Sequence, residues 1–436
     1  MALINRPEYM EQLNLWRSQD DLIKIITGVR RCGKSTLLKL FQDYLKTIDI
    51  IDKQMITLNL EDDDQTKKIG LKINIKTKLL ENYEVLLDFI TGKIQKNKKT
   101  YVFLDEIQLL DNWQRLANTL RMKKNVDVYL TGSNAYMFSS ELATLLGGRY
   151  IEIKMQPLSF KEFVSGIHQG QDAGGRNLDY YGLYETYTRQ SGFPQTLAFA
   201  GKQDMIHNYL LDSVYKNTVQ KDIVQRFRIS DPVRLDEVIK FMFDTVGSRT
   251  SLRNVQNKLK TAGIDISPVT LNTYVRGLLD SYLMYKCEEY DLKGKRILES
   301  DAKYYVADIG LKNALLGSSD TGIGHELENI VYLELKRRAY EVKIGRVKTK
   351  AVKTGDISED KTIEVDFVAS KGGGIVEYYQ VAWSVLENEQ TLKREYAPLE
   401  LIKDNYPKYL LTMDLGSGGQ NGIKRINVLT WLMGEE

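Results

Sequence analysis

The sequence has few of the residues that build covalent or metal frameworks. Its 436 residues include two cysteines, Cys32 and Cys287, and three histidines. Two cysteines this far apart offer no disulfide framework and no thiolate zinc site. Three histidines argue against a His-rich metal centre. The shortage therefore excludes folds that depend on disulfides or on clustered zinc ligands.

Long apolar runs are also absent. No run is long enough to cross a bilayer, and the first residues lack a signal-peptide pattern. We therefore expect a cytoplasmic protein without a membrane partner. Hydrophobic residues make up 42% of the chain and charged residues 27%, which is typical of soluble globular proteins. The net charge of +3 is too small to predict nucleic-acid binding, which must rest on local patches.

The chain length predicts two to four domains. In the first part, short apolar strands alternate with longer helices, which predicts an α/β fold with a doubly wound sheet up to about residue 155. Residues 159–228 are mainly helical and predict a lid or connector, so the first predicted domain is 1–228. The expected strands of its sheet are residues 22–27, 56–60, 101–104 and 126–130.

The second predicted domain, residues 229–316, has three helices followed by a hairpin, a pattern typical of a winged helix. Ser267 and Pro268 form the expected start of the third helix. Thr273 and Arg276 lie on its polar face, which with the basic hairpin turn is a candidate DNA contact. The alternative is a winged helix used only for packing between domains. The basic residues of the turn are Lys293, Lys295 and Arg296.

The third predicted domain, residues 317–436, begins with a helix at 325–338 and continues with apolar strands. A glycine-rich segment near Gly418 resembles a transporter signature, but no helix pattern follows it. We interpret that segment as a loop and not as a phosphate site. The expected strands are residues 342–347, 363–369, 376–384 and 408–412.

A phosphate-binding pattern, G-x-x-x-x-G-K-[ST], is met by Gly28, Gly33, Lys34 and Ser35. A chain of this length would match it by chance at roughly the one-in-a-hundred level. The pattern follows a buried strand and opens a helix, so backbone N–H groups can cradle phosphates. Lys34 is expected to reach the β- and γ-phosphates and Ser35 to bind Mg²⁺. The whole expected segment is Gly28, Val29, Arg30, Arg31, Cys32, Gly33, Lys34, Ser35 and Thr36.

An acidic pair, Asp105 and Glu106, ends the apolar strand 101–104. Asp105 is expected to bind Mg²⁺ through water, beside Ser35. Glu106 is expected to orient and deprotonate the attacking water. An acidic pair alone is a weak signal, but together with the phosphate-binding pattern it predicts ATP hydrolysis with Mg²⁺ as cofactor.

Three further residues are candidates for the same site. Ser133 and Asn134 end the next strand and can contact the γ-phosphate or the water, unless they form an ordinary capped turn. Arg149 can supply positive charge to the transition state, from this subunit or from a neighbour, or it is a surface arginine. Residues 97–100 lack the aspartate that reads guanine, so ATP is favoured over GTP.

In this order, the motifs resemble the prokaryotic AAA-type ATPases with a C-terminal domain of unknown function. The resemblance covers nearly the whole chain. It implies ATP binding, a winged-helix middle and a restriction-endonuclease-like C-terminal core, and it names no substrate. It supports roles for Lys34, Ser35, Asp105, Glu106 and Ser133 or Asn134. The motifs that carry it start at Gly28, Leu104, Thr131, Leu146 and Pro157.

Restriction-like nucleases place a Glu on the first helix, an Asp at the end of a strand and Glu-x-Lys on the next strand. Glu326 and Asp366 fit the first two places, and Gln380 stands at the third. Ala382 occupies the lysine position and can neither polarise water nor neutralise phosphate. We therefore predict a nuclease fold with a degraded site, residual or altered activity being the alternative.

The predicted function is an ATP-driven switch or remodeller that acts on DNA or on a DNA-bound protein. Two alternatives stay open. One is a nucleotide-sensing regulator that hydrolyses ATP rarely, and the other is an ATP-dependent nuclease. The sequence predicts no particular oligomeric state.

Overall fold

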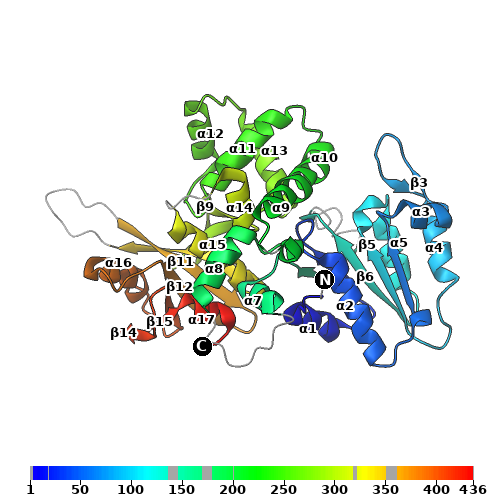
Figure 1. Cartoon of the computed structure of the whole chain (residues 1–436), viewed down its shortest axis with the longest axis horizontal. Coiled ribbons are helices and arrows are strands. Elements are labelled where there is room, and N and C mark those ends of the chain that lie inside the picture. The colour runs from blue at the N-terminus through cyan, green and yellow to red at the C-terminus, as the bar shows by residue number, and fades with distance from the viewer. Residues whose placement is uncertain are drawn as a thin grey trace.

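The computed structural model describes residues 3–17, 19–135, 146–168, 179–199, 201–317, 322–349 and 361–435 (Figure 1). A five-stranded sheet lies at one end of the molecule and an eight-stranded sheet at the other, with helices between and above them. Over these ranges, no helix is long and apolar enough to cross a membrane.

The N-terminal sheet is parallel throughout, in the order β2-β5-β6-β1-β7. Its three central strands are fully buried, which explains their continuous apolar sequences. The four predicted strands are confirmed, and a fifth strand adds beside β1. The bounds are β1 Ile23–Thr27, β2 Met55–Asn59, β5 Thr100–Asp105, β6 Val126–Gly132 and β7 Tyr150–Lys154.

Helices cover both faces of this sheet, so the predicted doubly wound arrangement is confirmed. Alternate residues of β5 point to opposite faces. Phe103 packs with Phe41 and Tyr129 on the face covered by α1 and α2. Val102 and Leu104 belong to a separate core on the face covered by α4 and α5. The bounds are α1 Pro7–Trp16, α2 Lys34–Thr47, α3 Asp63–Ile69, α4 Tyr83–Thr91 and α5 Trp113–Arg121, with a small hairpin of β3 (Lys72–Ile73) and β4 (Leu80–Glu81).

The helical region after the sheet contains an unusual long helix. It begins as α9, and its middle consists of two π-helical segments, η5 and η6. π-Helical turns are rare and are frequent at functional sites. The bounds are α7 Phe160–His168, α8 Tyr180–Gln190, the 3₁₀ helix η4 Pro194–Phe199, α9 Gln203–Asn208, η5 Tyr209–Lys216, η6 Val219–Val224 and α10 Gln225–Phe227.

Three helices and a hairpin follow, as predicted. Each helix starts at a side-chain cap, provided by Asp231, Ser251 and Ser267. The expected helix start at Ser267 and Pro268 is therefore confirmed. The bounds are α11 Pro232–Asp244, α12 Leu252–Thr261, α13 Pro268–Asp280, β8 Met284–Asp291 and β9 Arg296–Val306.

This hairpin is not separate from the C-terminal region. Strand β8 pairs in parallel with β10, so both hairpin strands belong to the eight-stranded sheet, whose order is β14-β15-β13-β12-β11-β10-β8-β9. The boundary predicted between residues 316 and 317 thus crosses one continuous sheet. The remaining bounds are β10 Glu341–Thr349, β11 Lys361–Lys371, β12 Ile375–Ala382, β13 Lys408–Thr412, β14 Gly418–Gln420, β15 Ile423–Asn427, α14 Ile309–Leu316, α15 Ile323–Arg337, α16 Glu389–Glu400 and α17 Val428–Met433.

Candidate nucleotide-binding site

The loop between β1 and α2 has a backbone that requires glycine at two positions. Gly28 has φ +147°, and a Cβ atom there would lie 2.0 Å from the carbonyl oxygen of Met155. Gly33 has φ +106° and immediately precedes α2, which begins at Lys34. The loop therefore closes on the first turn of α2, where free N–H groups can bind an anion.

The side chain of Lys34 folds back onto this loop. Its Nζ donates hydrogen bonds to the carbonyl oxygens of Gly28, at 2.9 Å, and Val29, at 3.1 Å. The side chain is buried. Because both partners are neutral carbonyls, the ammonium charge is not cancelled and can attract phosphate oxygens.

Asp105 lies at the carboxyl end of β5, next to the end of β6. Burial raises the pKa of Asp105, and hydrogen bonds from the hydroxyls of Ser35 and Thr131 oppose that rise. A serine hydroxyl and an aspartate carboxylate that face each other are the donors that hold Mg²⁺ beside phosphates in such loops. The residues present therefore fit a magnesium ion.

Glu106 follows β5 with a left-handed backbone, φ +55°. This conformation is uncommon for a residue other than glycine and costs on the order of 1–3 kcal/mol. The Glu106 carboxylate accepts a short hydrogen bond from Gln108 Nε2, and Ser133 Oγ lies 3.4 Å from Oε2. The strained turn thus presents Glu106 beside Asp105, held by two neighbours.

Ser133 and Asn134 follow β6, and both are buried. The structure places Ser133 against Glu106, where it can orient that carboxylate. Two contacting residues, Gln108 and Thr131, were not singled out from the sequence. The signal for Thr131 was its hydroxyl near the carboxyl end of β6.

Arg30 makes a further contact that the sequence did not predict. Its guanidinium makes a two-pronged ion pair with Asp222 of η6, with Nε–Oδ2 at 2.6 Å and Nη2–Oδ1 at 3.0 Å. Its Nη1 lies 4.0 Å from Oε2 of Glu106. Burial raises the pKa of the Asp222 carboxyl, and Arg30 opposes that rise. The loop arginine therefore connects the acidic pair to the helical region.

Cys32 lies in the same loop, just before the start of α2. It is fully buried, and burial raises the pKa of its thiol. Because the thiolate is the reactive form, Cys32 is a packing residue of the loop.

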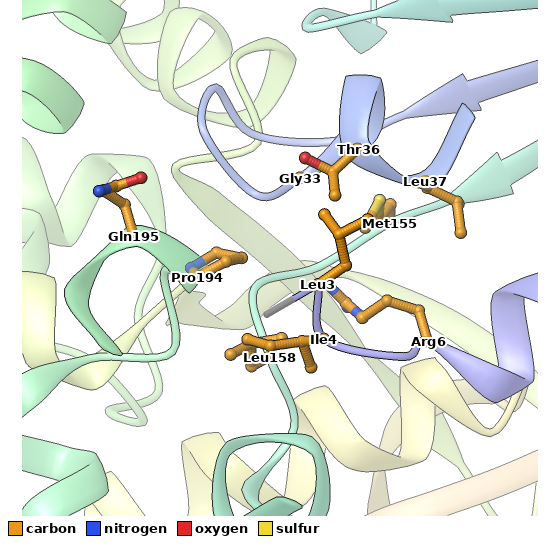
Figure 2. A pocket seen from close by; sticks show the side chains of 10 residues that line it. All are labelled: Leu3, Ile4, Arg6, Gly33, Thr36, Leu37, Met155, Leu158, Pro194 and Gln195. Atoms are coloured by element: carbon orange, nitrogen blue, oxygen red, sulfur yellow. The ribbon is translucent and has the colours of Figure 1, made fainter. Parts of the chain in front are cut away.

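A cavity of about 120 Å³ opens next to Gly33 at the start of α2 (Figure 2). Its walls come from the N-terminal segment, the first turn of α2, the strand end at Met155 and the start of η4. Arg6 in the wall is fixed by Glu162 Oε1 at 2.6 Å and by the carbonyl oxygen of Gln156 at 2.8 Å. The lining residues are Leu3, Ile4, Arg6, Gly33, Thr36, Leu37, Met155, Leu158, Pro194 and Gln195.

Comparisons with known proteins agree with this geometry. Residues 20–164 match an AAA domain, and residues 181–322 match a domain of unknown function. An uncharacterized protein of Haemophilus influenzae is 35% identical over 434 residues, covering 99% of each chain. The chain belongs to the same family, with an AAA-type ATPase domain at its N-terminus.

More distant proteins are also similar. An uncharacterized protein of Methanocaldococcus jannaschii is 28% identical over 394 residues, covering 88% of this chain and 79% of that protein. A solved Walker-type ATPase of Pyrococcus abyssi is 16% identical, with a TM-score of 0.45 over 72% of this chain and 95% of that chain. A TM-score below 0.5 does not establish a shared arrangement of the two whole chains.

Arg149 of this AAA-type ATPase lies at the wrong end of the sheet. The N–H of Ile23, the first residue of β1, donates to the carbonyl oxygen of Arg149 at 3.1 Å. Gly28 follows the opposite end of β1, roughly 16 Å away at about 3.3 Å per residue. Arg149 is therefore too far away to act on the nucleotide of its own chain, which leaves action on a neighbouring subunit or a surface arginine without a role in catalysis.

The cluster around Asp366 contains a different glutamate from the one that the sequence predicted. Glu326 does not join Asp366, because its Oε1 pairs with Lys312 Nζ at 2.8 Å. Glu328 joins instead, because residues two apart on a helix face different directions. Its Oε1 accepts hydrogen bonds from Lys303 Nζ at 2.8 Å and Tyr305 OH at 2.5 Å.

Lys303 of β9 lies among the carboxylates of this cluster. Its Nζ lies 2.7 Å from Oε1 of Glu364 and 3.8 Å from Oδ1 of Asp366. Burial and the nearby Glu328 raise the pKa of Asp366 well above its usual range, and Lys303 opposes them. Within the described ranges, no group of three or more His, Cys, Asp or Glu side chains is arranged to hold a metal ion.

Gln380 lies beside Asp366, as predicted. Its Oε1 accepts a hydrogen bond from the Asp366 N–H at 3.3 Å, and its Nε2 donates to Glu395 at 3.0 Å. The N–H of Val381 donates to Asp366 Oδ2 at 2.8 Å. The cluster is thus internally satisfied, with the lysine ammonium among its carboxylates.

The candidate DNA-contacting residues are at the surface, with one exception. Arg276 is exposed and lies 3.6 Å from Asp280 on the same helix. Thr273 is half-buried, and its hydroxyl donates to the carbonyl oxygen of Val269 at 2.9 Å. The turn lies beside β10, because the N–H of Leu292 donates to Arg346. The exposed residues of the turn are Lys293, Lys295 and Arg296.

Proposed function

We propose that the chain binds ATP with Mg²⁺, hydrolyses it, and uses this cycle to switch its grip on DNA or on a DNA-bound protein. The observation that carries the proposal is the convergence of three parts at one sheet edge. These parts are the Lys34 ammonium inside the loop, the facing Ser35 and Asp105 oxygens, and Glu106 directly beside them.

Each residue has a defined role in this proposal. N–H groups of the loop and of the first turn of α2 bind the phosphates, and Lys34 neutralises the β- and γ-phosphates. Ser35 and Asp105 hold the magnesium ion, which supplies charge neutralisation at the phosphates. Glu106 orients a water molecule and accepts its proton, while Gln108 and Ser133 fix the Glu106 carboxylate.

The cavity beside Gly33 supports a purine as the base. Its walls are mainly apolar and it opens where the loop meets α2, within reach of a nucleotide whose phosphates lie on the loop. Pro194 and Gln195 of η4 line the opposite side. A base in this cavity would therefore touch both the ATPase sheet and the helical region.

The DNA part of the proposal rests on local chemistry. Arg276 and the basic turn supply positive charge on a winged-helix-like arrangement of three helices and a hairpin. The helix that carries Arg276 also packs on the helical region, since a Cβ at Gly277 would lie 2.6 Å from Ile223 of η6. A change at the nucleotide site can therefore reach this helix through the contact between η6 and Gly277.

A second function, a nucleotide sensor with little turnover, is favoured by one observation. Gln108, Ser133 and Arg30 all face Oε2 of Glu106, so this oxygen must leave those contacts before it can accept a proton from water. A base that must first be released gives slow hydrolysis. A nuclease is disfavoured, because Lys303 occupies the space among the carboxylates.

One experiment separates these functions. ATP binding and steady-state turnover are measured on the full chain, with and without duplex and single-stranded DNA, and DNA integrity is followed in the same tubes. We expect ATP binding, and turnover that DNA stimulates. Binding without turnover would replace the switch by the sensor, DNA cleavage would select the nuclease, and absence of ATP binding would remove all three.

A further inference from the structure

We propose that Arg30 contacts the γ-phosphate of ATP and stabilises the transition state of hydrolysis, and that Asp222 is its positioning residue. This inference rests on the proposed ATP hydrolysis. It assigns the transition-state arginine to the loop itself, whereas Arg149 lies at the opposite end of the sheet.

The location of the guanidinium supports a contact with the γ-phosphate. Arg30 sits on the loop between Gly28 and Lys34, so its backbone belongs to the phosphate cradle. Its Nη1 lies 4.0 Å from Glu106 Oε2. Glu106 addresses the water that attacks the γ-phosphate, so a cation this close to Glu106 lies at the γ end of the nucleotide.

The hydrogen-bond geometry leaves one nitrogen of Arg30 for a ligand. Nε and Nη2 are used by the Asp222 carboxylate, at 2.6 and 3.0 Å. Nη1 lies 4.0 Å from Glu106 and 3.9 Å from Glu61, both longer than a hydrogen bond. Across the part of the chain that the structure describes, these are the acceptors that Nη1 approaches, so its two protons can turn to a phosphate oxygen.

Asp222 is placed to hold Arg30. It is buried in the π-helical segment η6, and both its oxygens bind the same guanidinium. A two-pronged pair fixes the plane of the guanidinium as well as its position. Next to Asp222 in the sequence, Lys221 binds Glu61 Oε1 at 2.8 Å. The π-helical segment η6 thus supplies a carboxylate that fixes the orientation of the Arg30 guanidinium.

The pair also makes the site sensitive to the difference between ATP and ADP. ADP has no γ-phosphate for Nη1 to contact, so Arg30 would remain held by Asp222 alone. With ATP, Arg30 would be shared between Asp222 and the γ-phosphate. The contact between the loop and the helical region carrying Asp222 would therefore differ between the ATP and ADP states.

The test compares Arg30→Ala, Arg30→Lys and Asp222→Asn in the full-length protein. The measured quantities are kcat, KM and the Kd values for ATP and ADP. We expect Arg30→Ala to lower kcat about 10³-fold, the lower end of the range for a transition-state arginine. ADP affinity should change less than about threefold, because the lost contact is to the γ-phosphate.

The conservative variants separate positioning from folding. Arg30→Lys keeps the charge but loses the fork, and should recover part of kcat. Asp222→Asn should lower kcat about tenfold with little change in ADP affinity, since Asn keeps one acceptor for Arg30. The matched control is Asp212→Asn, an exposed carboxylate on the adjacent segment η5, which should leave kcat unchanged.

Loss of Arg30 leaves Asp222 buried without its partner, which can unfold the protein. The double variant Arg30→Gln/Asp222→Asn removes that unpaired charge and is measured alongside, with thermal unfolding as a check. Equal losses of ATP and ADP affinity, or a kcat within threefold of wild type, would overturn the inference while leaving the ATPase intact. Wild-type protein that does not bind ATP would overturn the proposed function itself.

Discussion

The two acidic centres of this chain differ in what their lysines bind. In the N-terminal site, Lys34 donates to the backbone carbonyls of Gly28 and Val29, and Asp105 receives only hydroxyl hydrogen bonds. In the C-terminal cluster, Lys303 binds the carboxylates directly. The first arrangement leaves a carboxylate for a metal ion, and the second satisfies it internally.

This difference shows why a set of acidic residues does not by itself define a metal site. Both centres have buried carboxylates, Asp105 at the end of β5 in the first, and Asp366 in the middle of β11 with Glu328 on α15 in the second. The position of the ammonium group decides whether an incoming cation meets uncompensated negative charge or a completed ion pair. Removing the charges of either centre one at a time should therefore affect the two centres differently.

The largest effect is expected from Lys34→Ala. The variant removes the charge that faces the phosphates, and charge-assisted hydrogen bonds of about 1.5–3 kcal/mol each predict at least a 100-fold loss of ATP affinity. The fold should survive, because the lysine bonds only to loop carbonyls. Affinity is measured with a fluorescent ATP analogue and folding by thermal unfolding. Equal affinity in variant and wild type would show that the loop does not bind phosphate.

Glu106→Gln should keep ATP binding and lower turnover about 10²-fold or more, because an amide cannot accept the proton of water. Steady-state phosphate release is the measurement. Glu185→Gln, an exposed glutamate on α8, serves as control. If turnover falls less than threefold, Glu106 is not the base and the sensor function loses its explanation.

The C-terminal cluster is tested by removing its cation. Lys303→Met leaves Glu328, Glu364 and Asp366 without their ammonium, which should destabilise the fold by about 3–5 kcal/mol. If the lysine is what closes this site, Mn²⁺ should now raise the unfolding temperature of the variant and leave wild type unchanged.

The matched control for this experiment is Lys312→Met, which breaks the corresponding pair with Glu326 outside the cluster. It should show no rescue by Mn²⁺. Wild-type protein should not cut linear, supercoiled or branched DNA with Mg²⁺ or Mn²⁺. Cleavage that disappears in Asp366→Ala would mean that the cluster is an active nuclease centre in spite of Lys303.

Charge reversal at Lys293, Lys295 and Arg296 should weaken duplex binding and flatten its dependence on salt. Each lost phosphate contact lowers the slope of log K against log salt by about 0.9. Binding is measured by fluorescence anisotropy over a salt series. An unchanged slope would mean that the turn serves packing against β10. The control reverses three exposed lysines near the β3–β4 hairpin of the ATPase domain, Lys72, Lys76 and Lys78.

Local patterns were enough to predict the first site. Gly28 to Ser35 carry their own backbone requirements, and Asp105 and Glu106 stand at the end of an apolar strand, so spacing along the chain predicted where these residues lie. The parallel sheet followed from the same alternation of strands and helices. In these parts, neighbours in the sequence are neighbours in the site.

Long-range packing decided what the sequence did not predict. Arg30 and Asp222 are 192 residues apart, and no local pattern connects them. Glu326 and Glu328 share one helix, so the packing of α15 determines which of them meets Asp366. The pairing of β8 with β10 joined two predicted domains, and the pairing of β7 with β1 put Arg149 at the far end of the sheet.

The smallest expected effect tests the route between the nucleotide site and α13. A Cβ at Gly277 would lie 2.6 Å from Cγ2 of Ile223, the residue after Asp222 in η6. Gly277→Ala must therefore push α13 away from η6, and overpacking of this kind costs about 1–3 kcal/mol. If η6 transmits the nucleotide state, the variant should also reduce the stimulation of turnover by DNA while ATP affinity stays within threefold. Gly263→Ala has open space around its Cβ and is strained by its φ of +86° instead of by contact with η6, so it controls for general destabilisation. Equal DNA stimulation in Gly277→Ala and wild type would mean that η6 positions Arg30 without reporting its state to α13.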